Sequence, residues 1–177
     1  DTYIDSLGPS SSNDAGELSI SSSQYTLFGC DIRNHILPRG LAVTDVELRM
    51  KSSYVSGSIS ASAYELINHR WDEGSATWEN YEGANNWSGF GASGSDRGQL
   101  LDSTTISGGS TPTWFSWNVT IAVQNSMRWD VPVDFLIIGT GSGAAAMTDK
   151  ENAGSAADYP ELVINYSPGS MAVPDPP

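Results

Sequence analysis

The sequence has few positive charges and no long apolar run. Only two lysines, Lys51 and Lys150, occur in 177 residues, and 21 acidic residues against 8 basic ones give a formal net charge of −13. A surface this acidic repels a phosphate backbone, which argues against nucleic-acid binding. No segment reaches the roughly 18 apolar residues that a membrane span requires, so the chain is not expected to span a membrane.

Residues for catalysis or redox chemistry are also scarce. The single cysteine, Cys30, cannot form an internal disulfide, and its place in the apolar run YTLFGCDI predicts a small buried side chain. The two histidines, His35 and His69, have no zinc-ligand spacing with it. No serine lies in a G-x-S-x-G segment, and pairs of carboxylates arise by chance in so acidic a chain. The sequence therefore predicts a protein that is not an enzyme.

Strand patterns dominate what is present. Short runs of alternating apolar residues recur between Ser/Gly/Asn clusters, which predicts a single all-β domain of the sandwich type. In one of these runs the expected inward face is Val46, Leu48 and Met50. Residues 1–167 are expected to form the domain, and 168–177 a Pro-rich tail or linker. The expected strands are 2–5, 17–21, 24–32, 43–51, 57–67, 113–118, 133–138 and 161–166; one helix is expected over 119–129, and long loops over 83–112 and 139–158.

Aromatic residues concentrate in the segment WDEGSATWENYEGANNWSGF, residues 71–90. Trp71 and Trp78 are expected to be buried beneath a long loop. Trp87, in the Asn-rich part, is the best candidate for an exposed ring that stacks on a sugar. Its expected companions in binding are Tyr81, Asn85, Asn86 and Phe90, together with Trp114 from the strand TWFSWN, where Trp117 faces the other way. The exposure of Trp87, Trp114 and Trp129 decides between a binding surface and a core.

The order of these segments resembles the DNRLRE domains, extracellular modules related to the disaggregatase repeats and to a carbohydrate-binding module family that binds alginate. The matching pieces are DTYID, VTDVELRM, AYELINHRWDEGSATWENYEGANNW, FSWNVTIAVQ, VDFLIIGTGSG and MTDKENAGSAADYPELVINY. The resemblance implies a β-sandwich of jelly-roll type in a secreted or cell-surface protein. One stretch departs from the family pattern: Gly29 and Cys30 interrupt a strand that usually carries an arginine.

Calcium is the cofactor that the resemblance suggests. Jelly-roll modules that bind sugars often hold a structural calcium where the first strand meets the last loop, and hard cations prefer carboxylate and carbonyl oxygens. By that analogy the expected ligands are Asp1, Asp14, Asp149 and Glu151. The alternative is a solvated acidic surface, because the chain has no EF-hand spacing.

Two functions follow from these observations. The first is a non-catalytic, extracellular or cell-surface module that binds polysaccharide through aromatic stacking and polar loop residues. An acidic ligand such as alginate would then need calcium bridges or a basic patch, for which Arg70, Arg97 and Arg128 are the nearby candidates. The second is a structural subunit of a surface assembly, such as a fibre, cell-wall layer or virion decoration, in which copies of the chain or other surface proteins are the partners.

Overall fold

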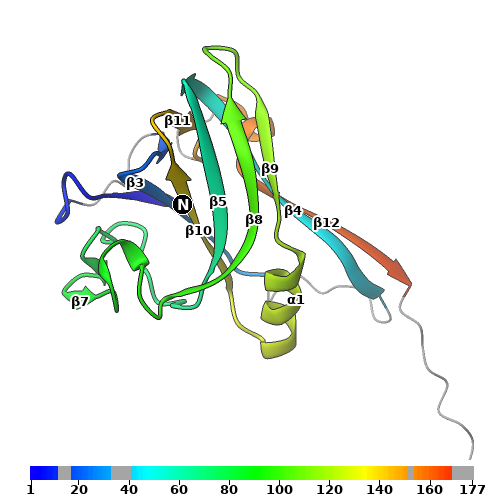
Figure 1. The fold of residues 1–177 in the computed structure, drawn as a ribbon. Coiled ribbons are helices and arrows are strands. Elements are labelled where there is room, and N and C mark those ends of the chain that lie inside the picture. The colour runs from blue at the N-terminus through cyan, green and yellow to red at the C-terminus, as the bar shows by residue number, and fades with distance from the viewer. Residues whose placement is uncertain (12–16, 33–40, 151–153, 169–177) are drawn as a thin grey trace, which may run out of the picture.

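The computed structural model describes residues 1–11, 17–32, 41–150 and 154–168 and is a sandwich of two antiparallel sheets (Figure 1). The expected all-β sandwich with one short helix is confirmed. The strands are β1 (Thr2–Asp5), β2 (Leu18–Ile20), β3 (Gln24–Cys30), β4 (Leu41–Ser56), β5 (Ser58–Leu66), β6 (Asn80–Glu82), β7 (Asn85–Asn86), β8 (Arg97–Ser107), β9 (Trp114–Asn118), β10 (Val133–Thr140), β11 (Ala144–Met147) and β12 (Glu161–Pro168); the helix is α1 (Thr120–Trp129), and two 3-10 turns are η1 (Phe90–Ala92) and η2 (Ala156–Asp158).

From β1 to β5, and again from β8 to β11, successive strands alternate between the two sheets; β6 and β7 pair only with each other. The first sheet has the order β1-β3-β10-β5-β8, and the second has β12-β4-β11-β2, with β9 paired to β4. Residues 47–49 of β4 pair with both β9 and β12, so these two strands lie on opposite sides of it. The last strand continues through Pro168, one residue beyond the expected domain end; residues 169–177 of the expected tail lie outside the described residues.

The main core lies between the two sheets and follows the predicted alternation. Val46, Leu48 and Met50 of β4 are fully buried, as expected. The indole N–H of Trp117, on β9 of the second sheet, donates to the carbonyl of Ala61 on β5 of the first at 2.8 Å. This buried bond satisfies the one polar atom of the largest side chain in the core and links the two layers.

A second apolar cluster covers the outer face of the first sheet. Strand β10 is central in that sheet: Phe135 and Ile137 face the main core, while Leu136 and Ile138 face outward into the second cluster. The segment between β5 and β8 folds over these residues (Figure 1) and contributes most of the aromatic side chains. Strand β10 is thus buried on both faces, which explains the apolar run FLII at its centre.

Two regions expected to be loops contain strands. The range 83–112 includes the eleven-residue edge strand β8, and 139–158 includes β11. Both are poor in large apolar residues: β8 reads RGQLLDSTTIS with Ile106 as its only buried residue, and β11 reads AAAM. Neither sequence has the apolar pattern that predicts a strand. Each segment is a strand because its backbone pairs with a neighbour, β8 with β5 and β11 with β4.

Helix α1 closes one end of the sandwich. Its N-cap residue, Val119, makes no side-chain capping bond; the Thr120 N–H instead donates to the side-chain oxygen of the preceding Asn118 at 3.1 Å. The helix ends at Asp130, which adopts a left-handed conformation (φ 54°) and donates its N–H to the carbonyl of Ser126. Among the described residues no helix is long and apolar enough to cross a membrane.

Candidate functional site

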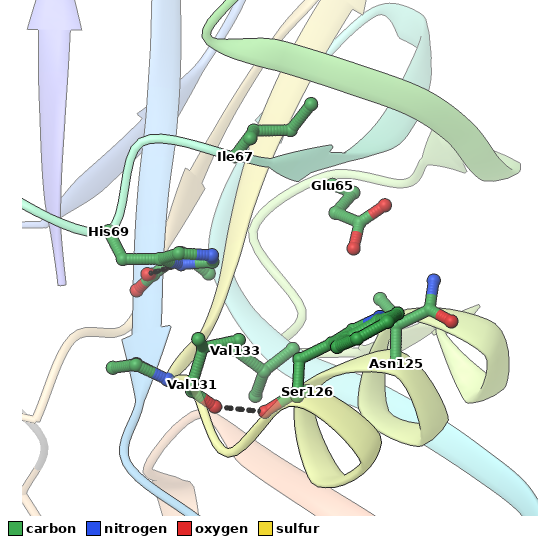
Figure 2. A pocket seen from close by; sticks show the side chains of 11 residues that line it. Glu65, Ile67, His69, Asn125, Ser126, Val131 and Val133 are labelled. Atoms are coloured by element: carbon green, nitrogen blue, oxygen red, sulfur yellow. Dashed lines mark hydrogen bonds and ion pairs between the residues drawn. The ribbon is translucent and has the colours of Figure 1, made fainter.

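A cleft of about 290 Å³ lies where α1 meets the first sheet. Its floor is formed by buried residues of α1 and β10, and its walls come from the end of β5, the loop after it, and the turn between α1 and β10 (Figure 2). The volume is at the lower end of the range for ligand pockets, about 300–1,000 Å³. The lining residues are Glu65, Ile67, His69, Ala122, Asn125, Ser126, Trp129, Val131, Pro132, Val133 and Asp134.

One rim of the cleft carries an exposed aromatic ring and unpaired polar groups. Trp129 is 67% exposed, and it lies one helical turn from Asn125, on the same face of α1. Figure 2 shows the Asn125 amide and the Glu65 carboxylate pointing toward each other across the cleft. Neither side chain makes a hydrogen bond or ion pair within the described residues. These groups are available to a bound molecule.

The opposite wall holds a histidine that a buried carboxylate orients. Nδ1 of His69 lies 2.7 Å from Oδ2 of Asp134, and the indole N–H of Trp71 donates to Oδ1 of the same carboxylate at 3.1 Å. Burial raises the pKa of Asp134, while the hydrogen bonds from His69 and Trp71 work in the opposite direction. Because Nδ1 is engaged, the other ring nitrogen of His69 is left for the cleft, into which the side chain points (Figure 2).

Glycine at position 29 makes room for this arrangement. A Cβ atom built there would lie 2.5 Å from Oδ1 of Asp134 and 2.9 Å from the Trp71 ring. Gly29 pairs directly with Asp134 across the β3–β10 ladder. The absence of a side chain at Gly29 therefore permits the close approach of the Asp134 carboxylate and the Trp71 indole.

The turn after α1 fixes the other side of the cleft. The Ser126 hydroxyl donates to the Val131 carbonyl (Figure 2), and the Val131 N–H donates back to the Ser126 carbonyl at 3.2 Å. Pro132 then leads into β10, as proline often follows a helix end. Trp129, in the last turn of the helix, is thereby held at the rim.

Comparison with known families decides what kind of module this is. The family model described as carbohydrate-binding module family 96 matches residues 1–166. The chain belongs to that family. A comparison with curated proteins finds no match. The family supports the expected binding of carbohydrate, and it agrees with the resemblance to a carbohydrate-binding family that the sequence suggested.

The structure corrects the expectation for Trp87, the leading candidate for a stacking residue of this module. Trp87 is 5% exposed, and its indole N–H donates to the carbonyl of Thr77 at 2.8 Å. Tyr81 is half-buried and packs edge-on against it, with ring centroids 5.7 Å apart. Both rings therefore pack into the second cluster, where they help to hold the segment between β5 and β8 against the first sheet. Trp71 and Trp78 pack against the same cluster, as expected.

The other predicted binding residues of the 71–90 segment are exposed. Phe90 is 62% exposed, at the start of η1, and Asn85 and Asn86 are exposed in the short strand β7. Asn85 donates to Glu82 at 3.4 Å. None of the three lines the cleft. A binding role for them stays a prediction.

Trp114 lies on the outer face of the second sheet, opposite to Trp117 in its strand, as predicted. It is half-buried, and the guanidinium of Arg49 lies over its ring at 5.3 Å. On the cleft side, Arg128 lies over the Trp129 ring at 5.1 Å. Trp129 is the only one of the six tryptophans that is mostly exposed within the described part of the chain.

The expected calcium ligands are only partly described. Asp14 and Glu151 lie outside the described residues. Asp1 and Asp149 are both buried, and Oδ1 of Asp1 has no hydrogen-bond partner. Nζ of Lys150 lies 3.9 Å from that oxygen and forms an ion pair with Glu73. Among the residues that the structure describes, no three acidic, histidine or cysteine side chains are grouped as metal ligands.

The sequence did not indicate Glu65, Asn125 or His69 as site residues. A signal for one pair was present: Asn125 and Trp129 are four residues apart in the expected helix and so share a face. No local signal links them to Glu65, because β5 and α1 are separated by more than fifty residues and meet only through the fold.

Proposed function

We propose that this module is a non-catalytic, extracellular or cell-surface polysaccharide-binding domain that holds its glycan in the Trp129 cleft. The observation that supports this most directly is the 67% exposure of Trp129 beside a cleft, in a family of carbohydrate-binding modules. The exposed face of the indole suits a sugar, because burying it against the apolar face of a pyranose is favourable.

The chemistry of the lining suits a sugar ring. The apolar face of a pyranose would stack on Trp129, and its hydroxyl groups would bond to the Asn125 amide and to the free nitrogen of His69. Glu65, near the end of β5, provides a further acceptor. A cleft that combines one aromatic platform with a few convergent polar groups is the usual form of a small-ligand site.

The free thiol of Cys30 does not support a catalytic function. Burial, together with the charges of Asp31 and Asp134, raises the pKa of Cys30, so its thiol is a weak nucleophile. We therefore propose that the domain binds its glycan without catalysing a reaction on it.

Affinity electrophoresis against a panel of neutral, acidic and basic polysaccharides tests the proposal. Alginate belongs in the panel because the DNRLRE resemblance suggests it. We expect at least one glycan to retard the wild-type protein and Trp129→Ala to lose that retardation. The matched control is Trp114→Ala, which removes the half-buried ring on the outer face of the second sheet.

Two outcomes would contradict the proposal. Loss of binding in Trp114→Ala but not in Trp129→Ala would move the site to the second sheet. No retardation with any glycan would leave the surface-assembly interpretation, and light scattering with and without residues 168–177 would then test self-association.

We also propose a structural calcium ion near Asp1 and Asp149. The supporting observation is a buried carboxylate oxygen of Asp1 with no hydrogen-bond partner, which a hard cation would satisfy. Thermal unfolding with calcium, magnesium or a chelator tests this. We expect calcium to raise the melting temperature of the wild type and not that of Asp149→Asn, whereas equal melting temperatures in all three conditions would exclude a structural ion.

A further inference from the structure

The contact between His69 and Asp134 determines where the imidazole proton lies. Nδ1 of His69 is 2.7 Å from Oδ2 of Asp134. At that distance a neutral imidazole carries its proton on Nδ1, because a bare nitrogen would set its lone pair against those of the carboxylate oxygen. The other ring nitrogen, Nε2, then has a lone pair and accepts a hydrogen bond. His69 lines the cleft, and Nε2 has no hydrogen-bond partner within the described residues.

A second donor keeps the Asp134 side chain in the form that this tautomer needs. The indole N–H of Trp71 donates to Oδ1 at 3.1 Å, so both oxygens of the carboxylate accept hydrogen bonds. Donors on both oxygens favour the ionised carboxylate over the protonated acid. Asp134 is buried, and Gly29, its partner across the β3–β10 ladder, leaves the space in which carboxylate and indole meet.

We propose that Asp134 and Trp71 are positioning residues that make His69 a hydrogen-bond acceptor, so that the cleft requires a sugar unit with an unsubstituted hydroxyl at this point. This inference rests on the proposed glycan site at Trp129. The hydroxyl would donate its proton to Nε2. Neutral and acidic sugars carry hydroxyl groups alike, so the requirement concerns substitution of the oxygen and not the charge of the sugar. A unit that is methylated or acetylated there has no proton to donate and would leave Nε2 unpaired.

The substitution Asp134→Asn reverses the polarity of Nε2 with little change of shape. The Trp71 N–H needs an acceptor, so the oxygen of the new amide turns toward the indole. The amide NH2 then faces His69 and donates to Nδ1, which moves the imidazole proton to Nε2. The cleft now presents a donor, which an ether or ester oxygen can accept as well as a hydroxyl. In the double variant Trp71→Phe/Asp134→Asn the indole N–H is gone, so the amide is free to turn its oxygen back to His69.

Nitrogen-15 NMR of the ligand-free protein tests where the proton lies. The chain has two histidines, His35 and His69, and the variant His69→Gln identifies the signals of the second. Spectra are recorded at mildly alkaline pH, so that the neutral imidazole is observed. We expect the proton on Nδ1 in the wild type, on Nε2 in Asp134→Asn, and at least partly back on Nδ1 in the double variant. A proton on Nε2 in the wild type, or on the same nitrogen in the wild type and Asp134→Asn, would overturn the inference.

Binding of substituted sugars measures the consequence for specificity. The probes are short oligomers cut from the glycan that retards the wild type, either unmodified or methylated at one hydroxyl. We expect methylation of one particular hydroxyl to weaken binding to the wild type about tenfold or more, as the loss of a hydrogen bond with its acceptor left unpaired gives. Asp134→Asn should reduce this one penalty and keep the penalties at other hydroxyls. The control Glu17→Gln removes the same charge from an exposed position outside the cleft and should keep every penalty.

The two measurements separate this inference from the proposed site. If binding survives in Trp129→Ala, or if no glycan retards the wild type, the site is refuted and the hydroxyl requirement falls with it, whatever the NMR spectra show. If Trp129→Ala loses binding but each methylation costs the same in the wild type and in Asp134→Asn, the site stands and the role of His69 as an acceptor is overturned.

Discussion

Replacing Trp87 and Trp129 separately by alanine should divide stability from binding. The sequence favours Trp87 as the residue that stacks on a sugar, whereas the structure favours Trp129. The first is 5% exposed in the second apolar cluster, and the second is 67% exposed at the rim of the cleft. The two substitutions remove the same atoms from opposite environments.

The magnitude for Trp87→Ala follows from burial. Truncating a buried tryptophan costs about 3–5 kcal/mol of the free energy of unfolding, from lost transfer energy and the cavity left behind. The Thr77 carbonyl, which accepts the indole N–H at 2.8 Å, also loses its partner. For a domain of this size, that loss lowers the melting temperature by about 6–20 °C.

Trp129→Ala should weaken glycan binding and leave stability nearly unchanged. Its side chain is mostly in solvent, so the free energy of unfolding should change by no more than about 0.5 kcal/mol. Affinity for the retarding glycan should fall by about thirtyfold, which corresponds to about 2 kcal/mol for a central binding residue.

Urea denaturation followed by tryptophan fluorescence measures stability, and affinity electrophoresis measures binding. A Trp87→Ala protein that unfolds at the wild-type urea concentration but no longer binds glycan would refute the assignment of Trp87 to the core. A Trp129→Ala protein that is destabilised by several kcal/mol would refute the assignment of Trp129 to the surface.

Two further predictions concern buried groups. Because burial raises the pKa of Asp134 in the folded state, its contribution to stability is complete below the ordinary aspartate pKa and is lost as pH rises through the raised value. As pH rises above the ordinary aspartate pKa of about 4, the free energy of unfolding of the wild type should therefore fall relative to that of Asp134→Asn, and a rise of the wild-type value relative to the variant would contradict the assignment. Gly91 has φ 65°, and a Cβ there would lie 2.7 Å from the Trp78 ring, so Gly91→Ala should cost about 1–3 kcal/mol in urea denaturation. Gly83→Ala is its control, with φ 52° but nothing within 4 Å, and an equal cost in both would show that backbone strain alone is responsible.

The sequence alone determined the layered fold, because strand alternation is a local property. The inward face of β4, the burial of Trp117 and the partial burial of Trp71 and Trp78 could all be read from period-two patterns and from the aromatic segment. It did not reveal β8 and β11, whose few apolar residues make them strands only through their partners.

Only the tertiary structure decided which tryptophan meets solvent. Trp87 and Trp129 each lie near polar residues in the sequence, but one is covered by a folded segment and the other lies at the end of a helix, beside a left-handed turn. The cleft, too, joins β5, α1 and β10 across long sequence separations. Burial and charge at such a site depend on contacts between distant segments, which no local pattern encodes.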